Sequence, residues 1–157
     1  MLLYPDCGVS IVVEILERVE PDASEDAIKF VSIACRAPLT ATRFHFDSLV
    51  QDNSAQKSEV SLIETLPKQS DGKTPPITRL SGFQDIKKFN RQTEDRVLIL
   101  MALYRVEEKP IDLVVTFNVP VVSEDGGAVD SDGLSTVQTA FNQFTRSLRI
   151  IDFDLFA

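Results

Sequence analysis

Residues Arg96–Pro120, with the sequence R-V-L-I-L-M-A-L-Y-R-V-E-E-K-P-I-D-L-V-V-T-F-N-V-P, predict the centre of the fold. Its first half is apolar at both alternating sets of positions, so we expect a strand that is buried on both faces at the centre of a sheet. Its second half alternates apolar residues with polar ones such as Asp112 and Thr116, as a strand with one apolar face does. The polar link between them is short and predicts an antiparallel hairpin, which we expect to end at Pro120 because proline cannot donate to a ladder.

The composition is that of a globular protein, with 157 residues, 43% hydrophobic residues and a formal net charge of −8. This length allows one domain with a sizeable core. An acidic chain repels phosphate, so nucleic acid is not an expected partner, whereas a basic protein surface is. Solubility alone would also account for the charge. No run approaches the roughly 18 apolar residues of a membrane span, and the first residues do not resemble a signal peptide.

The chain has two cysteines, Cys7 and Cys35, and a single histidine. They form neither a zinc-binding pattern nor a disulfide scaffold, so we expect free thiols in a reducing compartment. The prediction is a monomeric protein of the nucleus and cytoplasm that needs no metal and no cofactor.

The first predicted element is a helix that begins at Ser10 and stops at Pro21. Apolar residues follow helical spacing here, while Glu14 and Glu17 fall largely on the opposite face. Ser10 is a natural N-cap and proline ends a helix. The β-branched run Ile11–Val13 argues for a strand instead, but we favour the helix.

A second helix is predicted to begin at Asp22, where Glu25 three residues later suggests a capping box. Residues 30–43 then change character, because they are rich in small residues and contain Pro38, which breaks helices at a cost of about 3 kcal/mol. An amphipathic pattern resumes at Phe46. We therefore interpret residues 30–43 as a loop inserted into a helix.

The rest of the chain predicts two more strands and a final helix. The strands are Glu59–Leu66 and Ile77–Ile86, the second interrupted at Ser81-Gly82. Residues 123–133 read as a flexible acidic loop. The helix carries an apolar stripe at spacings of three and four, capped by residue 131, 132 or 135, and its apolar tail should dock on the body. The stripe is formed by Leu134, Val137, Phe141, Phe144 and Leu148.

No pattern in the sequence indicates catalysis. There is no phosphate-binding glycine loop and no nucleophile elbow. The lone His45 is interpreted as a partly buried or surface histidine rather than a general base. Glu14 and Glu17 could form a paired-carboxylate site, but this spacing is common on exposed helix faces. The protein is therefore not expected to be an enzyme.

Three stretches together resemble a known family: L-S-G-F-Q-D-I-K-K-F-N (Leu80–Asn90), the hairpin, and the ending L-R-I-I-D-F-D-L-F-A. With S-I-V-V-E-I-L-E-R-V from Ser10, their order and spacing are similar to the Ran guanine-nucleotide release factors of nuclear import. The resemblance implies an α+β fold with an antiparallel sheet packed between helices, shared with PsbP-like proteins. It also implies binding to the small GTPase Ran and release of its nucleotide.

The resemblance suggests five partner-binding residues on the surfaces that this chain retains: Glu14, Glu17, Gln84, Lys88 and Asn90. Turn hydrogen bonding or simple solvation are the alternative roles for these side chains. A PsbP-like interaction or structural domain without Ran activity is the alternative function.

Two departures from the family pattern stand out across what we take as a single domain of residues 1–157. The family opens with a strand and an acidic segment important for Ran binding, and Met1 aligns just after them, so we expect one or two missing strands. Residues 30–43 are the second departure. A retained intron read in frame, with an internal start at Met1, would explain both, and genomic DNA without splice signals around residues 30–43 would refute it.

Overall fold

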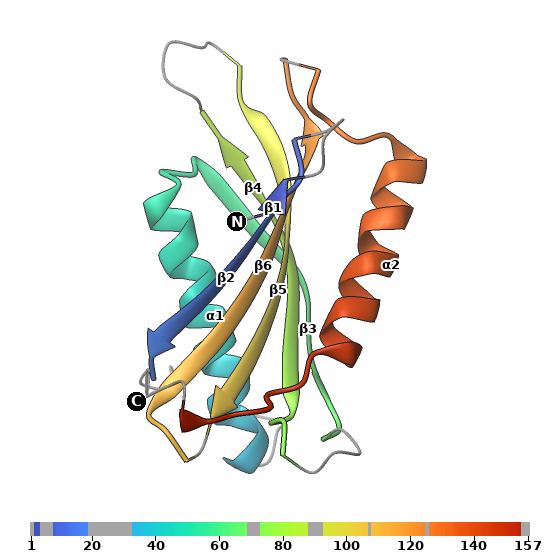
Figure 1. Ribbon diagram of the computed structural model, residues 1–157. Coiled ribbons are helices and arrows are strands. Elements are labelled where there is room, and N and C mark those ends of the chain that lie inside the picture. The colour runs from blue at the N-terminus through green and yellow to red at the C-terminus, as the bar shows by residue number, and fades with distance from the viewer. Residues whose placement is uncertain are drawn as a thin grey trace.

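The computed structural model describes residues 2–3, 8–18, 33–68, 73–87, 93–106, 108–124 and 126–154. The strands in this part of the chain form one antiparallel sheet with the order β1-β2-β6-β5-β4-β3. Figure 1 shows α1 on one face of the sheet and α2 on the other, which confirms the predicted α+β architecture. The elements are β1 (Leu2–Leu3), β2 (Ser10–Glu17), α1 (Ile33–Asp52), β3 (Lys57–Leu66), β4 (Ile77–Ile86), β5 (Asp95–Val106), β6 (Ile111–Val122) and α2 (Ser131–Ser147).

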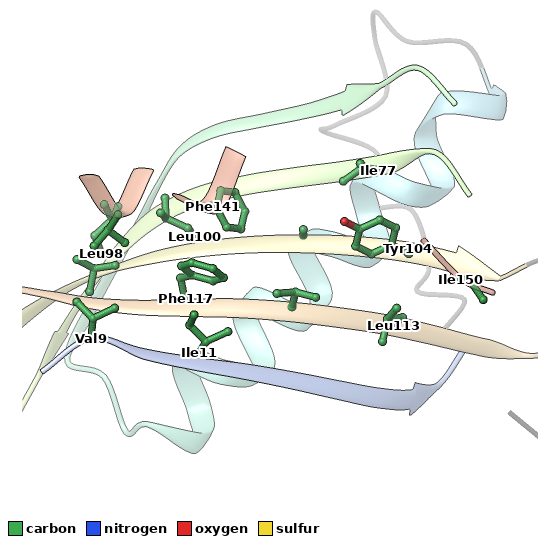
Figure 2. Close-up of a cluster of buried hydrophobic side chains, with 14 of the residues drawn as sticks. Val9, Ile11, Ile77, Leu98, Leu100, Tyr104, Leu113, Phe117, Phe141 and Ile150 are labelled. Atoms are coloured by element: carbon green, nitrogen blue, oxygen red, sulfur yellow. The ribbon is translucent and has the colours of Figure 1, made fainter. Parts of the chain in front are cut away.

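The predicted hairpin is confirmed as β5 and β6 at the centre of the sheet, paired from Val106 opposite Ile111 to Arg96 opposite Val122. Successive side chains of β5 point to opposite faces, and both sets are buried. Leu98, Leu100, Ala102 and Tyr104 join the core under α2 (Figure 2), whereas Ile99, Met101 and Leu103 join the core under α1. The two-sided apolar pattern thus reflects a helix on each face.

The prediction that Pro120 ends the hairpin is wrong, because β6 continues to Val122. Val97 pairs with Pro120 and Arg96 with Val122, so the register shifts by a bulge at this point. On the other side of β6, the ladder with β2 begins only at Asn118. Proline is tolerated at bulges and where a strand has lost one neighbour, so Pro120 fits without ending the strand.

Residues Ser10–Glu17 form the strand β2, so the predicted first helix is wrong. The strand pairs with β6 along its whole length, and the Ser10 hydroxyl accepts a hydrogen bond from Asn118 Nδ2 at 3.1 Å instead of capping a helix. The β-branched run Ile11–Val13 was the correct signal. The free edge of β6 offers a full ladder, and tertiary pairing overrides helical spacing. The start of the second predicted helix, Asp22, lies outside the described residues.

Helix α1 runs from Ile33 to Asp52 without a break at Pro38, so the loop predicted over residues 30–43 is wrong for residues 33–43. Proline removes one backbone hydrogen bond, but the helix buries Ala41 and Phe46 completely against the sheet. Burying a phenylalanine contributes about 1.5–3 kcal/mol, which offsets much of the cost of the proline. The amphipathic face that resumes at Phe46 is confirmed.

Strand β4 is continuous, so the predicted interruption at Ser81-Gly82 is wrong, and the irregularity lies in β3 between Val60 and Leu62. A Cβ atom at Gly82 would lie 2.7 Å from the Glu59 carbonyl oxygen and 2.9 Å from Phe46 Cζ. Glycine at this position therefore lets the Phe46 ring pack directly on the sheet.

The C-terminal helix is confirmed as α2, with Phe141 packed edge-to-face on Phe117 at a centroid distance of 5.2 Å. Its N-cap is Asp130, one residue before those that the sequence suggested, because the Asp130 carboxylate accepts from Gly133 N at 2.8 Å. The apolar tail docks as predicted over its described part, since Ile150 is buried and donates its backbone N–H to Thr74 Oγ1.

Candidate functional site

Glu14 and Glu17 lie on opposite faces of the sheet. They are three residues apart in β2, and side chains alternate between the faces of a strand. Glu14 shares the α1 face with Leu16, while Glu17 shares the other face with Ile11. Both glutamates are exposed. The alternative of a paired-carboxylate site is therefore excluded by geometry, although each side chain remains available to a partner.

Gln84 is fully buried on β4, three strand positions from β2 and so about 14 Å away across the sheet. Its Oε1 accepts a hydrogen bond from Asn53 Nδ2 at 2.8 Å, and its Nε2 has no hydrogen-bond partner among the described residues. In this conformation it holds the end of α1 to the sheet and presents no surface to a partner. Lys88 and Asn90 lie outside the described residues.

Strand β2 has an open outer edge. The short β1 pairs only with Ser10 and Ile11, and within the described part of the chain no strand pairs with the rest of that edge. Val13 and Ile15 are 53% and 57% exposed, beyond the cover of α2. An open edge with exposed apolar side chains can accept an extended segment of another protein by adding a strand.

On the other face of β2, a cavity of about 150 Å³ opens between β2 and α1. Helix α1 packs closest to β3, β4 and β5, which leaves this space beside β2 and β6. One face of α1 and one face of β2 line this cavity. Positions 45, 48, 49 and 52 share that face of the helix, and positions 14 and 16 share that face of the strand. The lining residues of this β2–α1 cavity are Glu14, Leu16, His45, Ser48, Leu49, Asp52, Met101, Val114 and Thr116.

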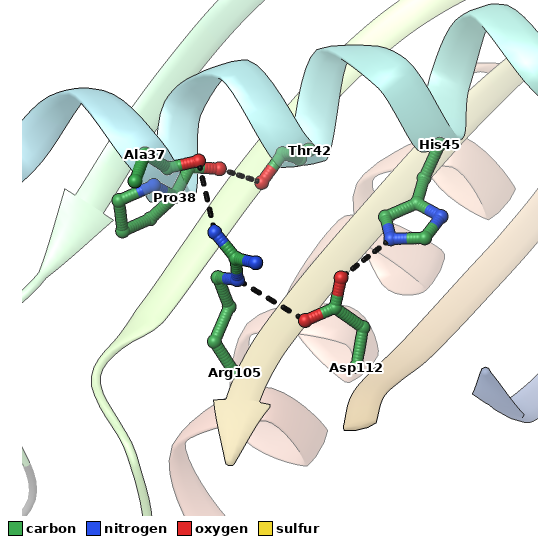
Figure 3. Close-up of polar contacts among 6 residues, drawn as sticks. All are labelled: Ala37, Pro38, Thr42, His45, Arg105 and Asp112. Carbon is green, nitrogen blue, oxygen red and sulfur yellow. Dashed lines mark hydrogen bonds and ion pairs between the residues drawn. The ribbon is translucent and has the colours of Figure 1, made fainter. Parts of the chain in front are cut away.

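A buried polar network supports the cavity from one side (Figure 3). The Asp112 carboxylate accepts from His45 Nε2 at 2.9 Å and from Arg105 Nε at 3.1 Å, and Arg105 Nη1 donates to the Ala37 carbonyl at 3.3 Å. The exposed fractions of the three side chains are 0% for Asp112, 6% for His45 and 8% for Arg105. The buried negative charge is therefore balanced by the guanidinium, and α1 is tied to the central hairpin.

The position of the proton on His45 follows from this network. A carboxylate beside a guanidinium accepts and does not donate, so His45 donates through Nε2. In the neutral imidazole the other nitrogen, Nδ1, is then an acceptor. Figure 3 shows it on the side of the ring away from Asp112, and it forms no hydrogen bond within the described residues. His45 lines the cavity, so this acceptor is available there.

Hydrogen-bond acceptors and apolar side chains line the cavity together. Glu14 and Asp52 line the cavity, and neither carboxylate forms an ion pair with another described residue. In the described part of the chain no group of three His, Cys, Asp or Glu side chains is placed to hold a metal ion, and no helix there is long and apolar enough to cross a membrane. The arrangement can bind a cationic donor.

The sequence alone did not identify Asp52 or Asp112 as functional residues, and His45 was interpreted as a partly buried or surface histidine without a functional role. A signal was present, because residues 45, 48, 49 and 52 have the spacing of one helix face. The assignment of residues 10–17 to a helix hid it, since only a strand brings Glu14 opposite that face.

Comparison with known proteins places the chain among relatives that interact with Ran. The family model described as Ran-interacting Mog1 protein matches residues 3–120. The Ran guanine nucleotide release factor of Danio rerio is 27% identical over 124 residues, covering 74% of this chain and 68% of that protein. The probable Ran guanine nucleotide release factor of Dictyostelium discoideum is 29% identical over 130 residues, covering 74% and 66%.

A solved structure shares the fold. The crystal structure of the Saccharomyces cerevisiae Ran-binding protein Mog1p matches with a TM-score of 0.62 and 22% sequence identity, covering 96% of this chain and 71% of that chain. The chain thus spans about two thirds of the length of the two sequence relatives and somewhat more of the structural one.

Proposed function

Because the chain belongs to the family of Ran-interacting Mog1 proteins, we propose that it binds the small GTPase Ran and promotes release of the guanine nucleotide bound to Ran. The family match over residues 3–120 is the observation that carries this proposal. In the cell, this activity would act in the nucleus and cytoplasm in support of nuclear protein import.

Nucleotide release of this kind needs no catalytic side chain on the exchange factor. A protein that binds nucleotide-free Ran more tightly than nucleotide-bound Ran lowers the affinity of Ran for its nucleotide by the same factor. A tenfold effect corresponds to about 1.4 kcal/mol of differential binding. The chain therefore acts as a regulator of Ran through its contact surface.

The contact surface we propose is β2, through its open edge and its two glutamates. Exposed Val13 and Ile15 give it apolar area, and Glu14 and Glu17 give it negative charge on both faces. The net charge of −8 favours encounter with a basic partner surface. Lys88 and Asn90 remain candidates beyond this surface, while buried Gln84 acts by holding Asn53.

The test uses Ran loaded with a fluorescent guanine nucleotide. The full chain should accelerate release of the nucleotide and co-elute with nucleotide-free Ran in size-exclusion chromatography. Glu17→Lys and Ile15→Ser should slow the release, because each alters the proposed surface without touching the core. Asp152→Asn is a matched control on the exposed C-terminal segment. No acceleration and no complex with a folded sample would reject the proposal.

A further inference from the structure

We propose that the β2–α1 cavity receives an arginine side chain from the protein partner. This inference rests on the proposed function in that the partner is Ran, and it adds which side chain chemistry is recognised and where.

The charged groups that line the cavity are both carboxylates, and the hydroxyls of Ser48 and Thr116 line it as well. Glu14 and Asp52 contribute carboxylates that pair with no other described residue. In its neutral form His45 contributes the acceptor Nδ1, from a side chain that is 6% exposed and lines the cavity. Both carboxylates are exposed, and two unpaired negative charges at one cavity favour a donor that is cationic and has no acceptor of its own. Arginine and lysine meet this requirement.

The size and lining of the cavity favour the planar guanidinium. A cavity of about 150 Å³ is large enough to hold a benzene ring, which has more heavy atoms than a guanidinium group. Leu16, Leu49 and Val114 line it, and they can pack against the alkyl stem of the incoming side chain. A guanidinium is more weakly hydrated than an ammonium and forms several directed hydrogen bonds at once, so it enters such a partly apolar space more readily.

No cation of the described chain occupies this position. Arg105 is the nearest buried one, and it is engaged by Asp112 and the Ala37 carbonyl on the far side of the network. Arg43 pairs with Asp47 on the exposed side of α1. Arg18 follows β2, but it does not line the cavity and has interactions of its own. No cation of the described residues therefore neutralises Glu14 and Asp52 at the cavity.

His45 provides a direct reporter because it is the only histidine in the chain. Its imidazole nitrogen signals can be followed by NMR while N-acetyl-arginine-methylamide is added to the full chain. We expect a saturable shift at Nδ1, because a donor enters beside it, and little change at Nε2, which stays bonded to Asp112. The shift should be absent with the neutral citrulline analogue and in the Glu14→Gln/Asp52→Asn double variant. Equal response to the lysine analogue would overturn the assignment to arginine, and no saturable response would overturn the site.

The second measurement is the affinity of the full chain for nucleotide-free Ran. Loss of one charge-assisted contact should weaken binding about tenfold, so Glu14→Gln and Asp52→Asn should each have this effect. Asp47→Asn is the control, because this carboxylate lies on the same helix but outside the cavity. Unchanged affinity in both cavity variants would overturn the proposal. If the unaltered chain does not bind Ran at all, the proposed function fails, and the arginine titration still decides the chemistry of the cavity.

Discussion

The buried pair Arg105–Asp112 makes a quantitative prediction about stability. Arg105 is 8% exposed and Asp112 is not exposed, and their atoms approach to 3.1 Å. Removing one member breaks a buried, hydrogen-bonded ion pair and takes this partner away from the other charge, which costs about 3–5 kcal/mol. We therefore expect Asp112→Leu and Arg105→Met each to destabilise the protein by this amount, a large part of the roughly 5–15 kcal/mol that holds a domain together.

The double variant Arg105→Met/Asp112→Leu should lose much less than the sum of the two single losses. Neither charge then remains buried, although His45 Nε2 loses its acceptor, which costs about 1–3 kcal/mol. Urea denaturation measures all three variants. With a denaturant slope of about 2 kcal/mol per molar, each single variant should lower the midpoint by roughly 1.5–2.5 M.

A matched control is available on the surface of the same helix. Arg43 and Asp47 are also a hydrogen-bonded pair, at 2.9 Å, but their side chains are 50% and 48% exposed. Solvent screens such pairs, so their coupling energy should stay within about 0.5 kcal/mol. If the Arg105 and Asp112 substitutions also prove additive within about 0.5 kcal/mol, the reasoning about a buried, mutually dependent pair is refuted.

Three further predictions concern the core, the pH dependence and the last helix. Gly82→Ala should cost about 1–3 kcal/mol in chemical denaturation, because its Cβ would meet the Glu59 carbonyl and the Phe46 ring, whereas Gly127→Ala, with no contact closer than 3.5 Å, should change little. Burial raises the pKa of Tyr104, with Arg149 and Arg79 opposing the rise, so the folded state keeps a proton that the unfolded state loses near pH 10. Stability should therefore fall as the pH rises above about 10, and Tyr104→Phe should make this fall shallower in urea titrations at pH 9 and 11; an equally steep fall would contradict the assignment. Asp130→Ala should lower the thermal stability by the equivalent of about 1 kcal/mol through loss of the α2 cap, and Asp130→Ser should restore most of it; equal losses in both would speak against capping.

A wrong secondary-structure assignment for one element also changes which of its side chains are expected at the candidate site. With Ser10–Glu17 taken as a helix, Glu14 and Glu17 appeared on one exposed face, and their roles could not be separated. In the strand, they belong to opposite faces, and only Glu14 meets His45 and Asp52 at the cavity. The change of one element from helix to strand thus changes which residues can act together.

The parts of the fold whose apolar patterns report burial directly could be predicted from the sequence. The apolar runs of β5 and β6 predicted the central hairpin, and the stripe from Leu134 to Leu148 predicted α2. Both predictions were possible because residues on a buried face are apolar at the spacing of the strand or helix that carries them. The α+β architecture followed from these elements and from the family resemblance.

Elements whose secondary structure depends on contacts with distant residues could not be predicted from the sequence alone. Ser10–Glu17 is a strand because it pairs with the edge of β6. Residues 33–43 are helical through Pro38 because the helix that they begin packs Phe46 on the sheet. Position 82 requires glycine because a Cβ atom there would meet the ring of Phe46. Local propensity differs between helix and strand by less than about 1 kcal/mol per residue, and a ladder or a buried aromatic ring outweighs it. For the same reason Glu14, which lies 31 residues before His45 and 38 before Asp52, reaches these two residues at the β2–α1 cavity only once the sheet and α1 have formed.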